Sequence, residues 1–164
     1  MILGMSVTTF TLFHVVLSLV GIAAGIVVMI GMLYAKKLET WTAVFLATTV
    51  LTSVTGYFFP RDHILPSHVF GVISLIVLAV CLYALYVRHL TGRWRWIYVV
   101  TAIVALYLNV FVLVVQAFLK VEPLKALAPT QAEPPFAIAQ GVVLLSYIAL
   151  GYLAVKKFHP RAGA

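Results

Sequence analysis

The sequence predicts an all-α integral membrane protein, a bundle of five transmembrane helices that forms a single domain over residues 1–164. Hydrophobic residues make up 64% of the chain and charged residues 9%. A water-soluble domain of this size could not cover so much apolar side chain with so few charges. The apolar residues gather in five stretches, each near the length of about 20 residues that a helix needs to cross the hydrocarbon core. These stretches are residues 9–34, 41–59, 66–87, 96–119 and 135–155.

The charged residues predict the orientation of the bundle. The connections after the first, third and fifth stretches are basic, with one acid, Glu39, among them. The connections on the other side carry as many acids as bases, so the whole net charge of +7 lies at one end. Because basic loops favour the cytoplasm, the sequence predicts an external N-terminus and a cytoplasmic C-terminus. The basic residues are Lys36, Lys37, Arg88, Arg93, Arg95, Lys156, Lys157 and Arg161.

Each stretch has features of a membrane helix. In the first, the basic residues follow the apolar run, as in an anchor and unlike a signal peptide, and Gly21 and Gly25 form a small-xxx-small packing pair. The second is rich in Ser and Thr, which can bond to backbone carbonyls or across helices. The third contains the only cysteine, Cys81, which excludes a disulfide within the chain. The fourth begins among tryptophans typical of an interface, and Pro134 and Pro135 suit the start of the fifth.

The first four stretches resemble two copies of one hairpin. The turn LYAKKL after the first stretch is similar to LYVRHL after the third, and His14-Val15 and His68-Val69 precede these turns at similar distances. Two tandem hairpins of the same orientation imply a twofold axis along the membrane normal. We therefore expect His14 and His68 to be counterparts across the centre of the bundle.

Polar side chains concentrate toward the external end and suggest a cofactor. Two helix-borne imidazoles at similar depth suit the axial ligands of a b-type haem, here His14 and His68. A second interpretation is a quinone, whose carbonyl oxygens would accept hydrogen bonds from His and amide side chains while the bundle holds its tail. Either ligand would be supported by amides on the fourth and fifth stretches and by one acid. These residues are Asn109, Gln116, Gln140 and Glu133.

A third interpretation is an external copper or zinc site, because imidazole and carboxylate ligands suit both ions. Its ligands would be His14, His63, His68, Asp62 and Glu133. The alternative to all three is that these residues only seal the end of the bundle, in a non-enzymatic subunit or scaffold of a larger membrane complex. No catalytic triad, phosphate loop or nucleotide motif is found, and enzymatic activity stays open.

The long external connection runs from Lys120 to Phe136, and its residues 123–127 have the spacing of a short amphipathic turn on the surface. We expect this connection to fold over the site, with Glu133 beside a histidine. The run WRWIYVVTAIVALYLNVFVLVVQAFLK, the loop APTQAEPPF and the turn HILPSH resemble those of a group of small bacterial multi-pass membrane proteins without an established activity. This resemblance implies a bacterial inner membrane and assigns no catalytic residue. The expected partners are the lipid bilayer and a membrane protein or a second copy of the chain, and not nucleic acid, because an anionic leaflet accounts for the basic charge.

Overall fold

Five long helices dominate the structure, a computed structural model that describes residues 1–2, 4–59 and 66–160, with the backbone alone for residues 66–68. The long helices are α1 (Val7–Leu33), α2 (Glu39–Thr55), α3 (Pro66–Leu82), α4 (Trp94–Lys120) and α6 (Pro134–Lys157). A 3₁₀ turn, η1 (Gly56–Phe58), continues α2, a π-helical turn, η2 (Tyr83–Val87), ends α3, and α5 (Glu122–Leu127) joins α4 to α6.

The predicted fold class is confirmed. Within the described ranges five helices are long and apolar enough to cross a membrane, as expected for a multi-pass membrane protein. Their bounds differ from the predicted ones by at most five residues, and α3 begins at Pro66 as predicted. The first helix begins at Val7, two positions early, because the Ser6 side chain accepts a hydrogen bond from the Thr9 N–H and caps it. The orientation of the bundle in the membrane stays a prediction.

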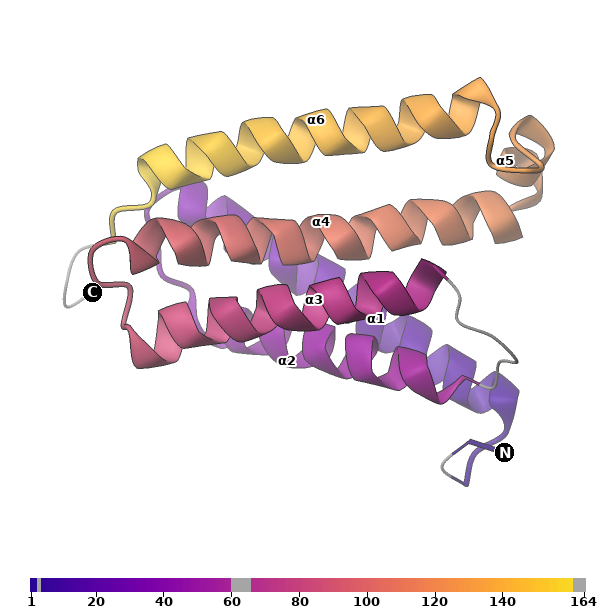
Figure 1. The fold of residues 1–164 in the computed structure, drawn as a ribbon, viewed down its shortest axis with the longest axis horizontal. Helices are drawn as coiled ribbons and strands as arrows, with labels where there is room; N and C mark the ends of the chain where they lie inside the picture. The colour runs from indigo at the N-terminus through magenta and orange to yellow at the C-terminus, as the bar shows by residue number, and fades with distance from the viewer. Residues whose placement is uncertain (3, 60–65, 161–164) are drawn as a thin grey trace.

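Helices α1 to α4 form a ring in which each packs against the next and α4 returns to α1 (Figure 1). Helix α6 lies outside this ring against α4, with a smaller contact to α1. In this arrangement α1 and α3 face each other diagonally. The pairs α1–α2 and α3–α4 are adjacent, as the hairpin interpretation requires, while the internal duplication itself stays a prediction.

The half of the bundle near the basic turns is closely packed. Its buried core includes side chains from every long helix, among them Met32, Phe45, Cys81, Leu106 and Ala154. The predicted glycine pair lies at the boundary of this half and is confirmed as a packing device. A Cβ atom on Gly25 would lie 2.6 Å from Leu106 Cδ1 and 2.9 Å from the Phe45 ring, so the side chains of α2 and α4 reach the α1 backbone only because this residue is glycine. We call this half the packed half.

At the basic end, arginine side chains connect the helix termini. Arg95, in the first turn of α4, donates hydrogen bonds of 3.1 and 2.5 Å to the carbonyls of Val155 and Phe158. These carbonyls belong to the end of α6, where the helix dipole favours a cation. Arg88 lies over the ring of Trp94, 5.4 Å from its centroid. Together these contacts fix the ends of α3 and α6 to the beginning of α4.

Candidate functional site

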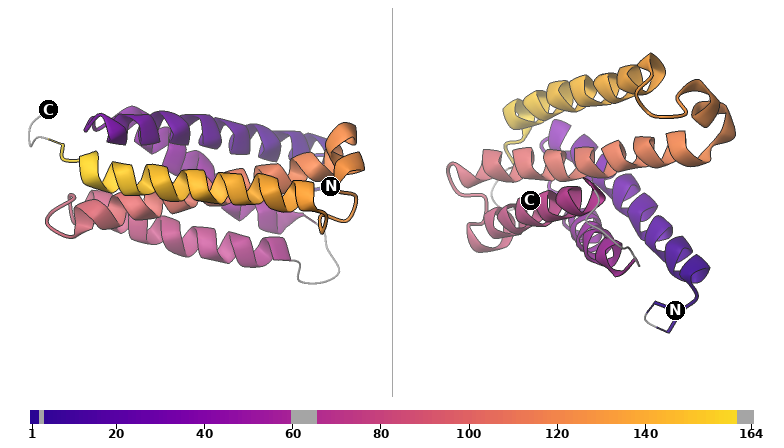
Figure 2. Two further views of the ribbon diagram at one scale, coloured as in Figure 1. Left: turned by 90° about the horizontal axis from the view of Figure 1, so that it is seen from above. Right: turned by 45° about the vertical axis from the view of Figure 1, so that its right-hand side comes forward.

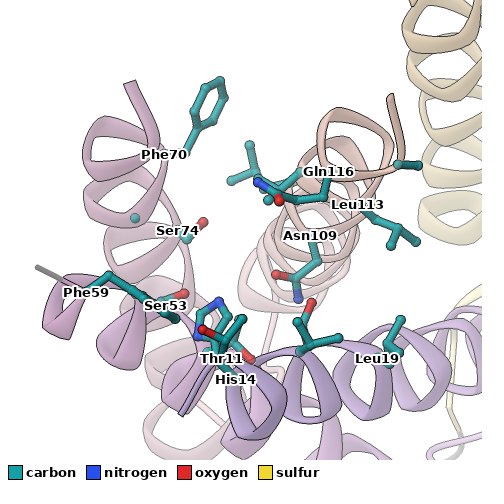
Figure 3. Close-up of a pocket in the computed structure, with 18 of the residues that line it drawn as sticks. Thr11, His14, Leu19, Ser53, Phe59, Phe70, Ser74, Asn109, Leu113 and Gln116 are labelled. Carbon is teal, nitrogen blue, oxygen red and sulfur yellow. The ribbon is translucent and has the colours of Figure 1, made fainter. Parts of the chain in front are cut away.

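A cavity of about 590 Å³ lies between α1, η1 and the ends of α2, α3 and α4 that are far from the basic turns. Figure 3 shows the side chains of α1, α3 and α4 around this space. Along α1 the lining extends from Thr11 to Leu19, just before the packed core begins at Ile22. We call this half of the bundle, from the floor of the cavity to the end with the N-terminus, the hollow half.

Small residues leave room for the cavity. Ser53, Gly56, Gly71 and Ala117 line it, where larger side chains would fill the space. Gly71 also lets the Tyr57 ring approach α3, because a Cβ atom there would lie 2.7 Å from the Tyr57 Oη. Small residues on α2 and its continuation, on α3 and on α4 thus leave space between the helices at this end of the bundle.

His14 is held in a defined orientation on the wall of the cavity. Its Nδ1 lies 2.8 Å from the Oγ1 of Thr55, and the Thr55 hydroxyl donates its single hydrogen to the Leu51 carbonyl at 2.7 Å. When the Thr55 hydroxyl donates to this carbonyl, Nδ1 of His14 is the donor to Oγ1. An edge contact with Phe59, at 5.2 Å between ring centroids, holds the other side of the imidazole. The two contacts fix the orientation of the imidazole ring.

The floor of the cavity is polar. Asn109, on α4, donates a hydrogen bond of 3.2 Å from Nδ2 to the Oγ1 of Thr49, on α2. Thr49 is fully buried, so this bond links α2 to α4, which is diagonally opposite in the ring, directly beneath the cavity. Thr52 and Ser74 line the cavity one helical turn above the packed core, and Leu108 completes the floor. The amides of Asn109 and Gln116 are on the side of α4 that faces α1 and α3 (Figure 3).

Exposed apolar residues of α1 and α4 line one side of the cavity, and we call this side its mouth. Helix α1 diverges from α4 toward its N-terminal end (Figure 2). Val15 and Leu19 on α1, and Val112 and Leu113 on α4, line the cavity and are exposed on the surface of the bundle. In a membrane these exposed side chains contact lipid, so an apolar molecule could reach the cavity from the hydrocarbon. Lys120 stands at the rim, and the described lining contains no acidic residue.

Three of the predicted site residues line the cavity: His14, Asn109 and Gln116. His68 is in the first turn of α3, diagonal to α1 as expected, but its side chain is outside the description, as are Asp62 and His63 altogether. The haem and metal pairings that need them therefore stay predictions. Within the described ranges no group of three or more His, Cys, Asp or Glu residues could hold a metal ion.

The structure places Gln140 and Glu133 away from the cavity lining. Gln140 is on α6, outside the ring, and its Nε2 donates to the Phe111 carbonyl at 3.1 Å. Glu133 accepts hydrogen bonds from the hydroxyl and the backbone N–H of Thr130, at 2.9 and 3.3 Å, within the connection after α5. That connection is attached to α4 through Gln131, which donates to the Val115 carbonyl. Only Lys120 and Val121, where the connection begins, line the cavity.

Thr52, Ser74 and Tyr57 also line the cavity, although they were not among the predicted site residues. Thr52 and Gly56 are four residues apart on α2 and its continuation, as are His14 and Ser18 on α1, so each pair lies on one helix face. The sequence feature that could have indicated the cavity is this occurrence of small or polar pairs on two adjacent helices.

In comparisons with known proteins, no family model, no curated protein and no solved structure matches this chain. The interpretation of the site therefore depends on its own residues and geometry.

Proposed function

We propose that this chain is a membrane protein of the bacterial inner membrane that binds a quinone, or a quinone-like lipid-borne molecule, in the cavity of the hollow half. The supporting observation is a cavity of about 590 Å³ with hydrogen-bonding side chains at its floor and exposed apolar side chains at its mouth. This volume falls within the range of about 300–1,000 Å³ that is typical of small-molecule sites. The arrangement suits an amphiphile with a compact polar head and an apolar tail.

The polar groups match the head of a quinone better than that of a charged lipid. Asn109, Gln116, His14 and the hydroxyls of Ser18, Ser53 and Thr52 are donors or acceptors without formal charge when the histidine is neutral. Two carbonyl oxygens of a quinone need donors of this kind. A lipid with a strongly charged head would have Lys120 alone as a counter-charge within the described lining.

The orientation of the chain determines which half of the membrane the cavity serves. Apart from Lys120 and Lys125, the described basic residues lie at the end opposite the cavity, at the turn after α1, from the turn after α3 to the first turn of α4, and at the end of α6. With that end in the cytoplasm, the N-terminus is periplasmic and the cavity opens within the periplasmic half of the membrane. A reporter fused after the last residue should register as cytoplasmic, and an external signal would contradict this orientation.

A binding experiment tests the quinone. The detergent-purified protein should release a quinone on solvent extraction, or bind an added short-tailed benzoquinone in calorimetry. Calorimetry is preferable to tryptophan fluorescence because Trp41, Trp94 and Trp96 are all at the basic end of α2 and α4. Gln116→Leu should weaken binding by about 3- to 10-fold, the effect of one lost hydrogen bond.

A matched control is Ser146→Ala, since the Ser146 hydroxyl is exposed on α6 and donates only to its own helix at the Val142 carbonyl. This variant should bind as the wild type does. A wild-type protein that neither contains nor binds a quinone overturns the proposal, and co-purification with a second membrane protein would then favour the scaffold alternative.

Haem is the second candidate, and one observation favours it. His14 lines the cavity with its Nδ1 bonded to Thr55, and His68 is on the diagonally opposite helix. The absorption spectrum of the purified protein distinguishes the candidates. A Soret band that is lost in His14→Ala and in His68→Ala supports haem, and a colourless protein that binds quinone rejects it.

A further inference from the structure

The hydroxyl of Thr52 is unusual among the polar groups of the bundle. Its Oγ1 is buried and has no hydrogen-bond partner in the structure, and Thr52 lines the cavity. Other threonines of the same helix behave differently: the hydroxyls of Thr48 and Thr55 each donate to a carbonyl of their own helix at 2.7 Å. A buried hydroxyl that makes no hydrogen bond costs free energy, and such groups normally indicate a missing partner.

Thr52 lines the cavity while its Oγ1 lies beneath the cavity surface, so a rotation about χ1 would turn the hydroxyl toward the contents of the cavity. Thr52 is one turn from Thr49, which receives the Asn109 bond beneath the cavity, and one turn from Gly56, which lines the wall. Ser74, which is 8% exposed, lines the floor from α3. The floor of the cavity therefore carries hydroxyl and amide groups from three helices, although it is the part farthest from the end of the bundle with the N-terminus.

Resting on the proposed function, we infer that the quinone binds head first and that the Thr52 side chain rotates to donate a hydrogen bond to one carbonyl oxygen at the floor. The tail then leaves between α1 and α4, past Leu19 and Leu113, which are exposed. In the reverse orientation an apolar tail would cover Thr52, Ser74 and Asn109 and leave the orphan hydroxyl without a partner. The polarity of the floor therefore determines the direction in which the ligand lies.

Thr52→Val tests this inference, because valine has nearly the shape of threonine and lacks the hydroxyl. The variant should bind a short-tailed benzoquinone about 3- to 10-fold more weakly than the wild type in calorimetry. Its unfolding temperature without ligand should not fall, since the substitution removes a hydroxyl with no partner in the protein. In infrared difference spectra, one quinone carbonyl stretch should move to higher frequency because it has lost a hydrogen bond.

Thr48→Val is the matched control, since Thr48 is on the same helix, does not line the cavity and already bonds to the Val44 carbonyl. It should leave the affinity and the carbonyl stretch unchanged. Equal affinity and identical spectra for both variants would overturn the inference while leaving quinone binding intact. A loss of stability in ligand-free Thr52→Val would also overturn it, because the hydroxyl would then have a partner in the folded chain. Absence of binding by the wild type would instead reject the proposed function.

Discussion

The packed half and the hollow half are built from the same four helices, yet they differ in what their facing positions contain. In the packed half the facing residues are large and apolar, as in Phe45, Leu78 and Leu106, and they are almost fully buried. In the hollow half, small or polar residues such as Ser53, Gly71 and Asn109 stand among apolar ones, and together they surround a cavity. The helices meet closely at one end because side chains interdigitate, and they diverge at the other end because the small residues cannot fill the space.

This difference indicates that the packed half holds the helices together and that the hollow half is suited to a ligand. Apolar side chains gain no hydrophobic free energy on packing within lipid, so close van der Waals contact is what holds membrane helices together. The packed half supplies that contact. The hollow half gives up such contact and exposes hydrogen-bonding groups instead, an arrangement that is expensive inside a membrane and suggests a ligand.

The largest expected effect compares two leucines on α4 that are seven residues apart and thus on one helix face. Leu106 is 1% exposed in the packed half, whereas Leu113 is 38% exposed on the cavity lining. Leu106→Ala should lower the free energy of unfolding by about 2–5 kcal/mol, because it leaves a cavity in a closely packed core. Leu113→Ala should cost less than about 1 kcal/mol, since its surroundings are already open. Denaturant titration in detergent measures both, and equal losses would show that the two halves are packed alike.

A smaller effect is expected at the boundary between the halves. Gly25→Ala would place a Cβ atom 2.6 Å from Leu106 and 2.9 Å from the Phe45 ring, so these side chains or the helices that carry them must shift. Overpacking of this kind costs about 1–3 kcal/mol. Gly141→Ala on α6 is the matched control, because a Cβ atom there meets nothing within 4 Å, and it should leave the unfolding temperature unchanged or slightly higher. A Gly25→Ala protein as stable as the control would contradict the close approach of α1.

The hydrogen bond from Asn109 to Thr49 should contribute less to the free energy of unfolding than the packing at Gly25 does. Hydrogen bonds between membrane helices contribute about 0.6 kcal/mol on average, and up to about 1.7 kcal/mol. Asn109→Leu and Thr49→Val should each lower the free energy of unfolding by an amount in that range. The double variant should lose less than the sum of the two, because both single changes remove the same bond. Strict additivity would mean that the two side chains do not interact.

The packed half could be predicted from the sequence more fully than the hollow half. Segment lengths and the glycine pair follow from composition and helical spacing. In the hollow half the same spacing places only Asn109, Gln116 and Lys120 near one face of α4. Gln140 and Glu133 could not be assigned, because depth in the membrane was inferable while the rotation and position of each helix were not. Gln140 is at a suitable depth, but α6 packs outside the ring, and its amide bonds to α4 instead. Thr52 was missed for a similar reason, since spacing alone does not reveal which hydroxyls of α2 bond to their own helix.

The smallest expected effect concerns Glu133, which belongs to neither half of the ring and serves the connection between α5 and α6. Burial acts to raise the pKa of Glu133, but the hydrogen bonds from the Thr130 hydroxyl and nearby backbone N–H groups outweigh it and hold the pKa below its ordinary value of 4.5. A carboxyl whose pKa is lower in the folded state stabilises that state fully above the unfolded pKa and loses the effect as the pH falls through the folded pKa. The Thr130 amide resonance should therefore titrate with a midpoint below 4.5, and in Glu133→Gln it should not titrate. Because this carboxylate is only partly buried and its partners all lie within the connection, the unfolding temperature of the bundle should change little across that range. A large acid-induced loss of stability that disappears in Glu133→Gln would show instead that the connection holds α4 and α6 together.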